Sequence, residues 1–198
     1  MRSRQLVLWI FVAAMAAAFA GVSAWKAGVF GGHDAPVAVG GPFQLTNQSG
    51  ARVDQKILKG KWSAVFFGYT YCPEACPTTL TTLAHAIDLL GPKAKDVRVV
   101  FVSIDPERDT PAQLKLYLSS QSFPKGTIGL TGSAAEVAAA AKAYHVYYAK
   151  SGKGADYTMD HSTALYLMDP DGRFQRVIAY GVTPEEMARQ IGDAMRGG

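Results

Sequence analysis

The sequence predicts an α/β fold with a mainly parallel β-sheet and helices on both of its faces. Segments with strand-like and helix-like patterns alternate along the chain, and this alternation favours that arrangement. Two segments of strand length, Trp62–Tyr69 and Val97–Ile104, are dominated by apolar residues, as expected of strands buried on both faces. The chain has 198 residues, and the part after residue 25 is long enough for one domain with a real core.

An opening β-hairpin and a first helix are predicted around these strands. Phe43–Thr46 and Ala51–Val53 have strand character, and the turn-forming segment Asn47–Gly50 separates them. Helical character extends over Thr78–Leu90, and Gly91-Pro92 directly afterwards is a typical stop signal. The hairpin therefore precedes the first buried strand, and the helix follows it.

Three later helices carry a common start signal, a Ser or Thr followed three residues later by Glu or Gln. In this pattern the hydroxyl can accept from an unpaired N–H, while the longer side chain can reach back. The signals begin at Thr110, Ser133 and Thr183. Pro111 and Pro184 stand at the first helical position, where the missing N–H costs nothing.

Further strands are predicted between and after these helices. Thr127–Leu130 and Tyr144–Ala149 are strand-like, and Thr163–Met168 and Phe174–Ala179 flank the turn sequence Asp169–Gly172 as an antiparallel hairpin. This order suits a thioredoxin-like α/β sandwich with a central mixed β-sheet, helices on both faces and an extra N-terminal β-hairpin.

Residues 1–25 are predicted to be a membrane anchor or a signal peptide. Arg2 and Arg4 precede Gln5–Trp25, which contains no charged residue. A basic flank before an apolar run keeps the N-terminus in the cytoplasm and exports the rest of the chain. A signal peptide would be cleaved near Val22-Ser23-Ala24. The run is long enough to span a bilayer, however, and an uncleaved anchor is therefore favoured.

Residues 26–39, rich in Gly and Ala, are predicted to be a linker, and residues 40–198 the folded domain. With an uncleaved anchor, the domain is held at the cytoplasmic (inner) membrane on its periplasmic, extracytoplasmic side. The net charge of the chain is only +4, without a run of Lys and Arg, and nucleic-acid binding is therefore not predicted. We expect a monomer.

The two cysteines, Cys72 and Cys76, are the strongest functional candidates. They lie within Gly68–Pro77 (GYTYCPEACP), between a predicted buried strand and the helix that follows. Ligands of open α/β sheets bind beyond the carboxyl ends of strands. Free N–H groups at a helix start also stabilise a thiolate. An exported domain of this size does not need a disulfide for stability, so the pair is available for chemistry.

The Cys-x-x-x-Cys spacing allows more than one use. If residues 72–76 form one helical turn, both sulfur atoms lie on the same face and could bind one metal ion. They could instead form a disulfide, which needs Cα atoms within about 7 Å. A pair of inert buried thiols is the third alternative, and the two prolines in the segment argue against it.

A third metal ligand must come from elsewhere in the chain, and His161 is the candidate. It precedes the apolar strand Thr163–Met168. In a thioredoxin-like fold, the loop entering this strand lies opposite the cysteine loop, so we expect His161 to reach the two cysteines. The remaining histidines are interpreted as solvated or structural: His33, His85 and His145.

Two thiolates and one imidazole suit one copper ion, because soft sulfur ligands select Cu(I) and imidazole also accepts Cu(II). A structural zinc site would take a fourth ligand, and the chain has no third cysteine to supply it. Met159 and Asp160 are the neighbours that could approach the ion. Asp160 could instead orient the imidazole as an outer carboxylate.

These segments resemble the Sco/SenC family of copper-binding cytochrome c oxidase assembly factors. The similarity extends from about Gly41 to Asp193 and rests on several motifs taken together. The motifs are GPFQL at 41–45, GYTYCPEACP at 68–77, SIDPERDTP at 103–111, LTG at 130–132, and DY with DHS within 156–162. Position 74 departs from the pattern, since Glu74 stands where the family usually has Asp, which leaves its role in the loop or in partner docking open.

The resemblance implies that Cys72, Cys76 and His161 are the copper ligands, with one ion per domain. It implies that the protein helps to build the binuclear copper centre of a haem–copper oxidase by delivering copper, by reducing the acceptor's cysteines, or both. The implied partners are the copper-bearing subunit of the oxidase or another copper chaperone. Asp105 and Arg108 match a family motif, and we expect them to support the metal-binding loop.

The main alternative is a thiol–disulfide oxidoreductase acting on exported proteins, with Cys72 and Cys76 as the redox-active residues. A low thiol pKa at a helix start would favour it. The three residues between Cys72 and Cys76 argue against an oxidoreductase. Such enzymes also keep a proline opposite their cysteines, and Ser151–Met168 contains none. A peroxidase would use Thr70 beside a reactive cysteine, but it would leave His161 unexplained.

Overall fold

The computed structural model describes residues 9, 14–15, 38–154 and 156–197, and Ala38–Gly198 forms a compact unit. Most of the predicted linker, including His33, and nearly all of the predicted anchor therefore lie outside the described residues. Within the described part of the chain, no helix has the length and apolar character that crossing a membrane requires.

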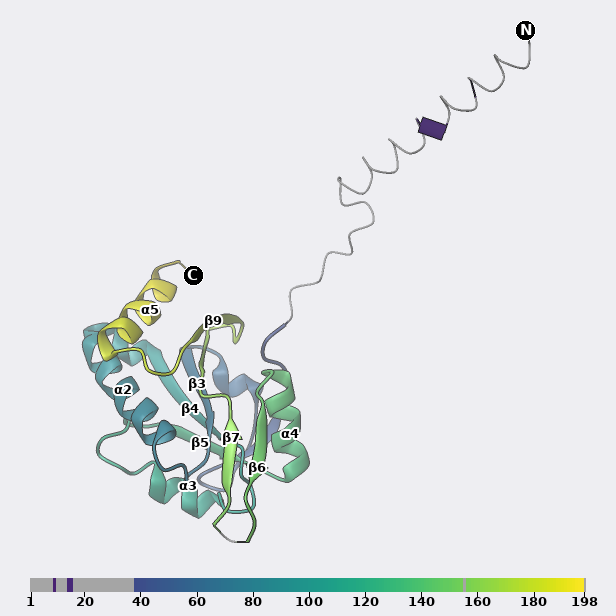
Figure 1. The fold of residues 1–198 in the computed structure, drawn as a ribbon. Helices are drawn as coiled ribbons and strands as arrows, with labels where there is room; N and C mark the ends of the chain where they lie inside the picture. Colours follow the sequence, from purple (N-terminus) through teal and green to yellow (C-terminus); the bar gives the residue numbers. More distant parts are fainter. Residues whose placement is uncertain (1–8, 10–13, 16–37, 155, 198) are drawn as a thin grey trace. The chain divides into compact units, whose positions relative to one another are not determined.

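A mixed sheet organises the domain, and its order is β2-β1-β5-β4-β3-β8-β9 (Figure 1). Its central strands β3 (Trp62–Gly68), β4 (Val97–Ser103) and β5 (Ile128–Thr131) are parallel. On the other side of β3, β8 (Leu165–Met168) and β9 (Phe174–Ile178) add an antiparallel hairpin. Every residue of β3 is buried, as its apolar run predicted.

The predicted N-terminal hairpin is present, formed by β1 (Gln44–Asn47) and β2 (Arg52–Asp54). The Asn47 side chain accepts from the backbone N–H groups of Ser49 and Ala51, both at 2.9 Å, and this closes the turn. β1 also pairs with β5, which joins the hairpin to the main sheet.

Four helices complete the domain within the described residues: α2 (Ala75–Leu89), α3 (Pro111–Tyr117), α4 (Ala134–Ala143) and α5 (Pro184–Gly197). α2 packs beside α5, and Figure 1 shows this pair and α4 on opposite sides of the sheet. The prediction of a mixed sheet with helices on both faces is therefore confirmed.

The three predicted helix starts differ in their details. At each, the hydroxyl accepts from the N–H three residues later, but only Ser133 and Glu136 form the reciprocal capping box. At the start of α3, Thr110 accepts from the Gln113 N–H at 3.2 Å. The Gln113 amide does not reach back to Thr110; it donates to Thr70 Oγ1 at 3.2 Å, close to the cysteine loop.

A separate antiparallel ribbon, formed by β6 (Tyr148–Ser151) and β7 (Thr158–His161), lies outside the main sheet (Figure 1). The predicted strand Tyr144–Ala149 is correct only at its end. Tyr144 caps α4 and its ring is buried against Phe67, while His145 has a left-handed backbone (φ 55°) that ends any extended segment there. β7 and the short 3₁₀ helices η1 (Gln55–Leu58) and η2 (Gly91–Asp96) were not predicted.

Candidate metal centre

The two cysteines lie at the junction between the end of β3 and the start of α2. The Cys72 N–H donates to the Tyr69 carbonyl at 3.2 Å, and α2 begins at Ala75. Cys76 is therefore in the first helical turn, whereas Cys72 precedes the helix, so the two cysteines do not share one helical turn. The Cys72 sulfur instead accepts from the Cys76 N–H at 3.4 Å, which pairs an N–H that the helix start would leave open.

The two sulfur atoms differ in exposure. Cys76 is fully buried, whereas Cys72 is half-buried. The absent side chain of Gly68 makes room for Cys76, because a Cβ at position 68 would lie 2.7 Å from its Sγ. The sulfur of Cys76 is thus fixed by packing, and the sulfur of Cys72 is the more accessible one.

The hydrogen bond between the two side chains separates their proton affinities. Donation from the Cys76 thiol lowers the pKa of Cys72 to about 3, although partial burial opposes this shift. The same hydrogen bond, with burial, raises the pKa of Cys76 far above the ordinary value. The opposite directions of the two shifts make Cys72 the more readily ionised thiol of the pair.

His161 ends β7, and its imidazole faces the cysteines. Its Nε2 atom is 3.7 Å from Cys76 Sγ, and its Nδ1 atom is 2.9 Å from the carbonyl oxygen of Ser162. A carbonyl oxygen can only accept, so Nδ1 carries a proton and Nε2 is the ring nitrogen that faces the sulfur atoms. The rings of Tyr69 and Phe66 contact the imidazole edge-on, with centroids 5.8 and 6.4 Å away.

Cys72, Cys76 and His161 together form a group able to bind a metal ion. One ligand atom from each lies within 4.8 Å of the others. Ligands bonded to one ion at about 2.0–2.3 Å lie roughly 3.5–4.5 Å apart, so only a small inward adjustment is needed. The donor set of two sulfurs and one imidazole nitrogen fits a soft ion such as Cu(I).

The other candidates near the site have different roles. His85 and His145 are exposed, and neither joins a group of metal-ligand atoms in the described part of the chain. Asp160 is exposed on the opposite side of β7 from His161 and does not orient it; the carbonyl of Ser162 does. The expectation that Asp160 acts as an outer carboxylate is therefore wrong.

A buried carboxylate that the sequence did not single out, Asp109, supports the cysteine loop. It accepts from the Thr70 N–H at 3.1 Å, from the Thr70 hydroxyl at 2.7 Å and from the Ser103 hydroxyl at 2.7 Å. Burial raises the pKa of Asp109, although these hydrogen bonds oppose the rise. Thr70 is two residues before Cys72, so Asp109 fixes the entry to the loop.

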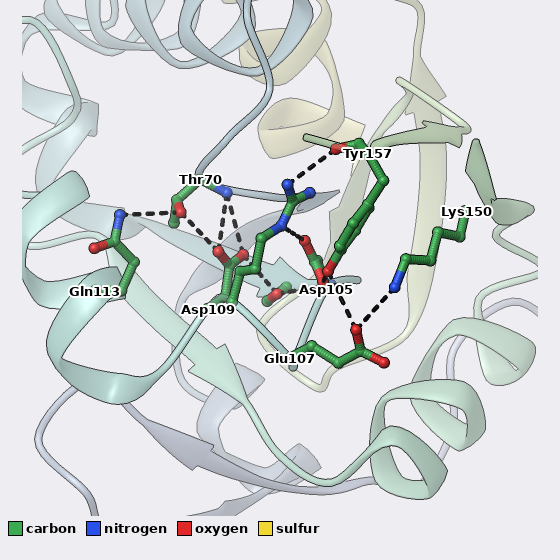
Figure 2. A network of polar contacts seen from close by, with 9 residues as sticks. Thr70, Asp105, Glu107, Asp109, Gln113, Lys150 and Tyr157 are labelled. Atoms are coloured by element: carbon green, nitrogen blue, oxygen red, sulfur yellow. Dashed lines mark hydrogen bonds and ion pairs between the residues drawn. The ribbon is translucent and has the colours of Figure 1, made fainter. Parts of the chain in front are cut away.

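Asp105 and Arg108 act on the other ligand-bearing segment, and Figure 2 shows Asp105 beside Tyr157. The Arg108 Nε–H donates to Asp105 Oδ2 at 2.6 Å, and its Nη1–H donates to the Tyr157 carbonyl at 2.9 Å. The Tyr157 hydroxyl donates to Asp105 Oδ1 at 2.6 Å. Tyr157 directly precedes β7. Arg108 also contacts the cysteine loop, as expected, because its guanidinium lies 4.8 Å from the ring centroid of Tyr71, the residue before Cys72. Arg108 therefore contacts both ligand-bearing segments, and Asp109 adds the hydrogen bonds to Thr70.

The fold and the site define a class: thioredoxin-like proteins with two cysteines after a central strand and a histidine facing them. A family model described as SCO1/SenC matches residues 32–196. The chain therefore belongs to the SCO1/SenC family.

Individual relatives agree with this assignment. Over 139 residues the chain is 46% identical to "Protein SCO1 homolog 1, mitochondrial" of Arabidopsis thaliana, a match covering 69% of this chain and 41% of that protein. It is similar to copper-bound ScoI of Bradyrhizobium japonicum, with 48% identity, a TM-score of 0.71 and coverage of 79% and 99%. It also resembles BsSco, described as a member of the Sco family of cytochrome c oxidase assembly proteins, with 28% identity, a TM-score of 0.64 and coverage of 82% and 94%.

Proposed function

We propose that this protein binds one copper ion, Cu(I) or Cu(II), through Cys72, Cys76 and His161. The observation that carries the proposal is the convergence of the three ligand atoms, within 4.8 Å of one another, from two segments far apart in the sequence. Similarity to a copper-bound ScoI supports the choice of metal. Soft thiolates favour Cu(I), and the imidazole extends the site to Cu(II).

Each side chain has a distinct task in loading. Cys72 offers a thiolate at the partly exposed end of the site, because its pKa is lowered to about 3. Cys76 must release a proton, since its buried thiol has a raised pKa and metal ligation requires the thiolate. His161 presents Nε2 to the ion, because its Nδ1–H is committed to the Ser162 carbonyl.

The bound copper serves assembly of the binuclear copper centre of a haem–copper oxidase. This role is supported by family membership and by the similarity to BsSco, itself described as belonging to a family of oxidase assembly proteins. The chain spans 41% of the Arabidopsis relative, and the proposal concerns the part the two share. The partner is the copper-bearing oxidase subunit or another copper chaperone. The protein acts as a monomer by delivering copper, by reducing the acceptor's cysteines, or both.

The domain works outside the cytoplasm on a membrane tether. Residues 1–25 serve as the anchor, residues 26–39 as the linker and residues 40–198 as the copper-binding domain. The basic residues before the uncharged run support this orientation, with the domain on the periplasmic side of the inner membrane. Glu74, exposed beside the site, is positioned to contact a partner there.

Thiol–disulfide exchange with unrelated exported proteins is not favoured as the main function. The low pKa of Cys72 is compatible with it. Exchange, however, does not require an imidazole whose Nε2 atom lies 3.7 Å from Cys76 Sγ. A metal ligand explains that arrangement directly.

Titration of the reduced full-length protein in detergent with Cu(I), against a competing chelator, tests the proposal. We expect one ion per chain, and His161→Ala should weaken binding at least about 100-fold, since loss of a ligand exceeds the usual effect of an outer residue. His145→Ala, in an exposed histidine away from the site, is the matched control and should bind like wild type. Wild-type affinity in His161→Ala would refute the three-ligand site.

A further inference from the structure

The β6–β7 ribbon presents His161 from outside the main sheet. At the end nearest β8, the Ser162 N–H donates to the Tyr147 carbonyl at 3.0 Å, and the Tyr147 N–H donates to Ser162 Oγ at 3.1 Å. No ladder of backbone hydrogen bonds joins the ribbon to the seven-stranded sheet in the described part of the chain. Its position along the rest of its length must therefore come from side chains.

Apolar packing does not supply that restraint along one side of the ribbon. A groove of about 460 Å³ lies there, between the ribbon and the segment after β4. The apolar residues that line it include Ile104, Pro106, Ala134 and Met159. Since an open groove lacks the close contacts of a packed interior, the ribbon could shift into it unless polar contacts hold it.

Asp105, Arg108 and Tyr157 bridge the segment after β4 to the ribbon by a closed circuit of hydrogen bonds (Figure 2). Asp105 accepts from the Tyr157 hydroxyl and from Arg108 Nε–H, both at 2.6 Å. Arg108 Nη1–H donates to the Tyr157 carbonyl at 2.9 Å and closes the circuit. The guanidinium also lies 3.6 Å from the Tyr157 ring centroid. Asp105 and Tyr157 are only 3% and 6% exposed, so these charge-assisted contacts are shielded from water.

The same short segment also binds the cysteine loop. Asp109, one residue after Arg108, accepts from the N–H and hydroxyl of Thr70, two residues before Cys72. Residues 105–109 thus contact both ligand-bearing segments. Tyr157 directly precedes β7, and His161 is the last residue of that strand, so a shift at Tyr157 moves the imidazole with it.

We propose that Asp105, Arg108 and Tyr157 form a positioning clamp that holds the ribbon where His161 Nε2 can share a metal ion with the two cysteines. The clamp acts on His161 through the backbone of β7. This inference rests on the proposed copper site and adds three residues that set its affinity from outside.

Tyr157→Phe is the sharpest test, because it removes the hydrogen bond to Asp105 and keeps the ring and the backbone carbonyl. In the full-length reduced protein we expect Cu(I) affinity to fall about tenfold, as for outer residues that orient metal ligands. Tyr144→Phe is the matched control, since the Tyr144 hydroxyl is buried without a hydrogen-bond partner among the described residues. It should leave the affinity unchanged.

A double-mutant cycle separates positioning of His161 from general stabilisation. In a His161→Ala background, Tyr157→Phe should weaken Cu(I) binding no further, because the imidazole it positions is gone. An equal tenfold loss in both backgrounds would overturn the clamp and leave the copper site intact. If Tyr157→Phe keeps the wild-type Cu(I) affinity while His161→Ala loses it, the clamp is also overturned and the copper site stands. If His161→Ala itself binds Cu(I) like the wild type, the copper site is refuted.

Hydrogen exchange of the metal-free protein supplies a readout that does not involve copper. Tyr157→Phe should speed exchange of the β6–β7 amides several-fold and leave the amides of α2 unchanged, because Tyr157 directly precedes β7 and the removed hydroxyl bonds to Asp105, not to α2. Unchanged exchange in the ribbon would contradict the proposal, as would an equal increase throughout the domain.

Discussion

The two arms of the metal centre are built in different ways. The cysteine arm belongs to the core: every residue of β3 is buried, Cys76 is fully buried, and Gly68 fits against its sulfur. The histidine arm is a two-stranded ribbon outside the main sheet, fastened through polar contacts at Tyr157. Dense packing fixes one arm, whereas a few shielded hydrogen bonds fix the other.

This difference divides the work of metal binding. The cysteine arm sets sulfur geometry and thiol chemistry, and changes there should affect folding as well as binding. The histidine arm supplies the third ligand from an element that lies outside the main sheet and meets the core through Tyr148 and Met159. A site that must both hold and release an ion benefits from one rigid arm and one adjustable arm.

The largest expected effect concerns the thiol chemistry of the cysteine arm. With a pKa of about 3, Cys72 should react with iodoacetamide at a nearly constant rate between pH 5 and pH 8. The rate of an ordinary thiol would rise on the order of several hundred-fold over this range. Cys76→Ala removes the donor that lowers the Cys72 pKa most, and the rate should then rise with pH. A steep profile in the wild-type protein would contradict the assigned thiolate.

The second effect tests how far Asp109 stabilises the cysteine arm. Asp109→Ala leaves the Thr70 N–H and the Ser103 hydroxyl without their acceptor, and should lower the free energy of unfolding by about 3 kcal/mol. Urea unfolding measures this loss. Asp109→Asn, the matched variant, keeps an acceptor oxygen and should lose less.

The pH dependence of stability gives Asp109 an independent check. Burial raises its pKa in the folded state, so the folded protein holds that proton more tightly than the unfolded chain does. The contribution of Asp109 to stability should therefore decrease as pH rises from its ordinary pKa, about 3.9, through the raised folded value. Asp109→Asn should flatten this part of the profile; an unchanged slope would show that the carboxyl titrates normally.

The third effect probes packing at the cysteines. A methyl group at Gly68 would lie 2.7 Å from Cys76 Sγ and 3.1 Å from the rings of Phe66 and Phe101. Gly68→Ala should therefore cost about 2 kcal/mol in unfolding free energy and also weaken Cu(I) binding, because the sulfur must shift. Gly197→Ala, at a helical glycine with no atom within 4 Å of the added carbon, should change neither quantity.

The sequence was informative where local pattern and burial coincide. The apolar runs predicted β3 and β4, and the turn residues of Asn47–Gly50 and Asp169–Gly172 predicted both hairpins. β7 escaped prediction because Thr158–His161 alternates between exposed and half-buried positions without an apolar face. Such a ribbon is stabilised by pairing with β6 and by contacts distant in sequence, which no local pattern records.

The site shows the same division. The proximity of His161 to the cysteines was expected only through the fold, since 85 residues separate it from Cys76. Asp109 was missed although it lies inside a recognised motif, because its acceptor role depends on burial beneath Thr70. Asp105 and Arg108 were noted, but their partner Tyr157 becomes visible only when the ribbon folds back.

The smallest expected effect on Cu(I) affinity comes from the exposed contacts of the ribbon, in contrast to the buried hydrogen bonds of Asp105 and Tyr157. Lys150 and Glu107 form an ion pair at 3.0 Å beside the clamp, but their side chains are 46% and 70% exposed. Water and salt screen such a pair, so Glu107→Gln should change Cu(I) affinity by less than about twofold, and high salt should remove the difference. Chelator competition at low and high ionic strength measures both. A loss as large as that of Tyr157→Phe would mean that the exposed pair, and not the buried circuit, holds the histidine arm.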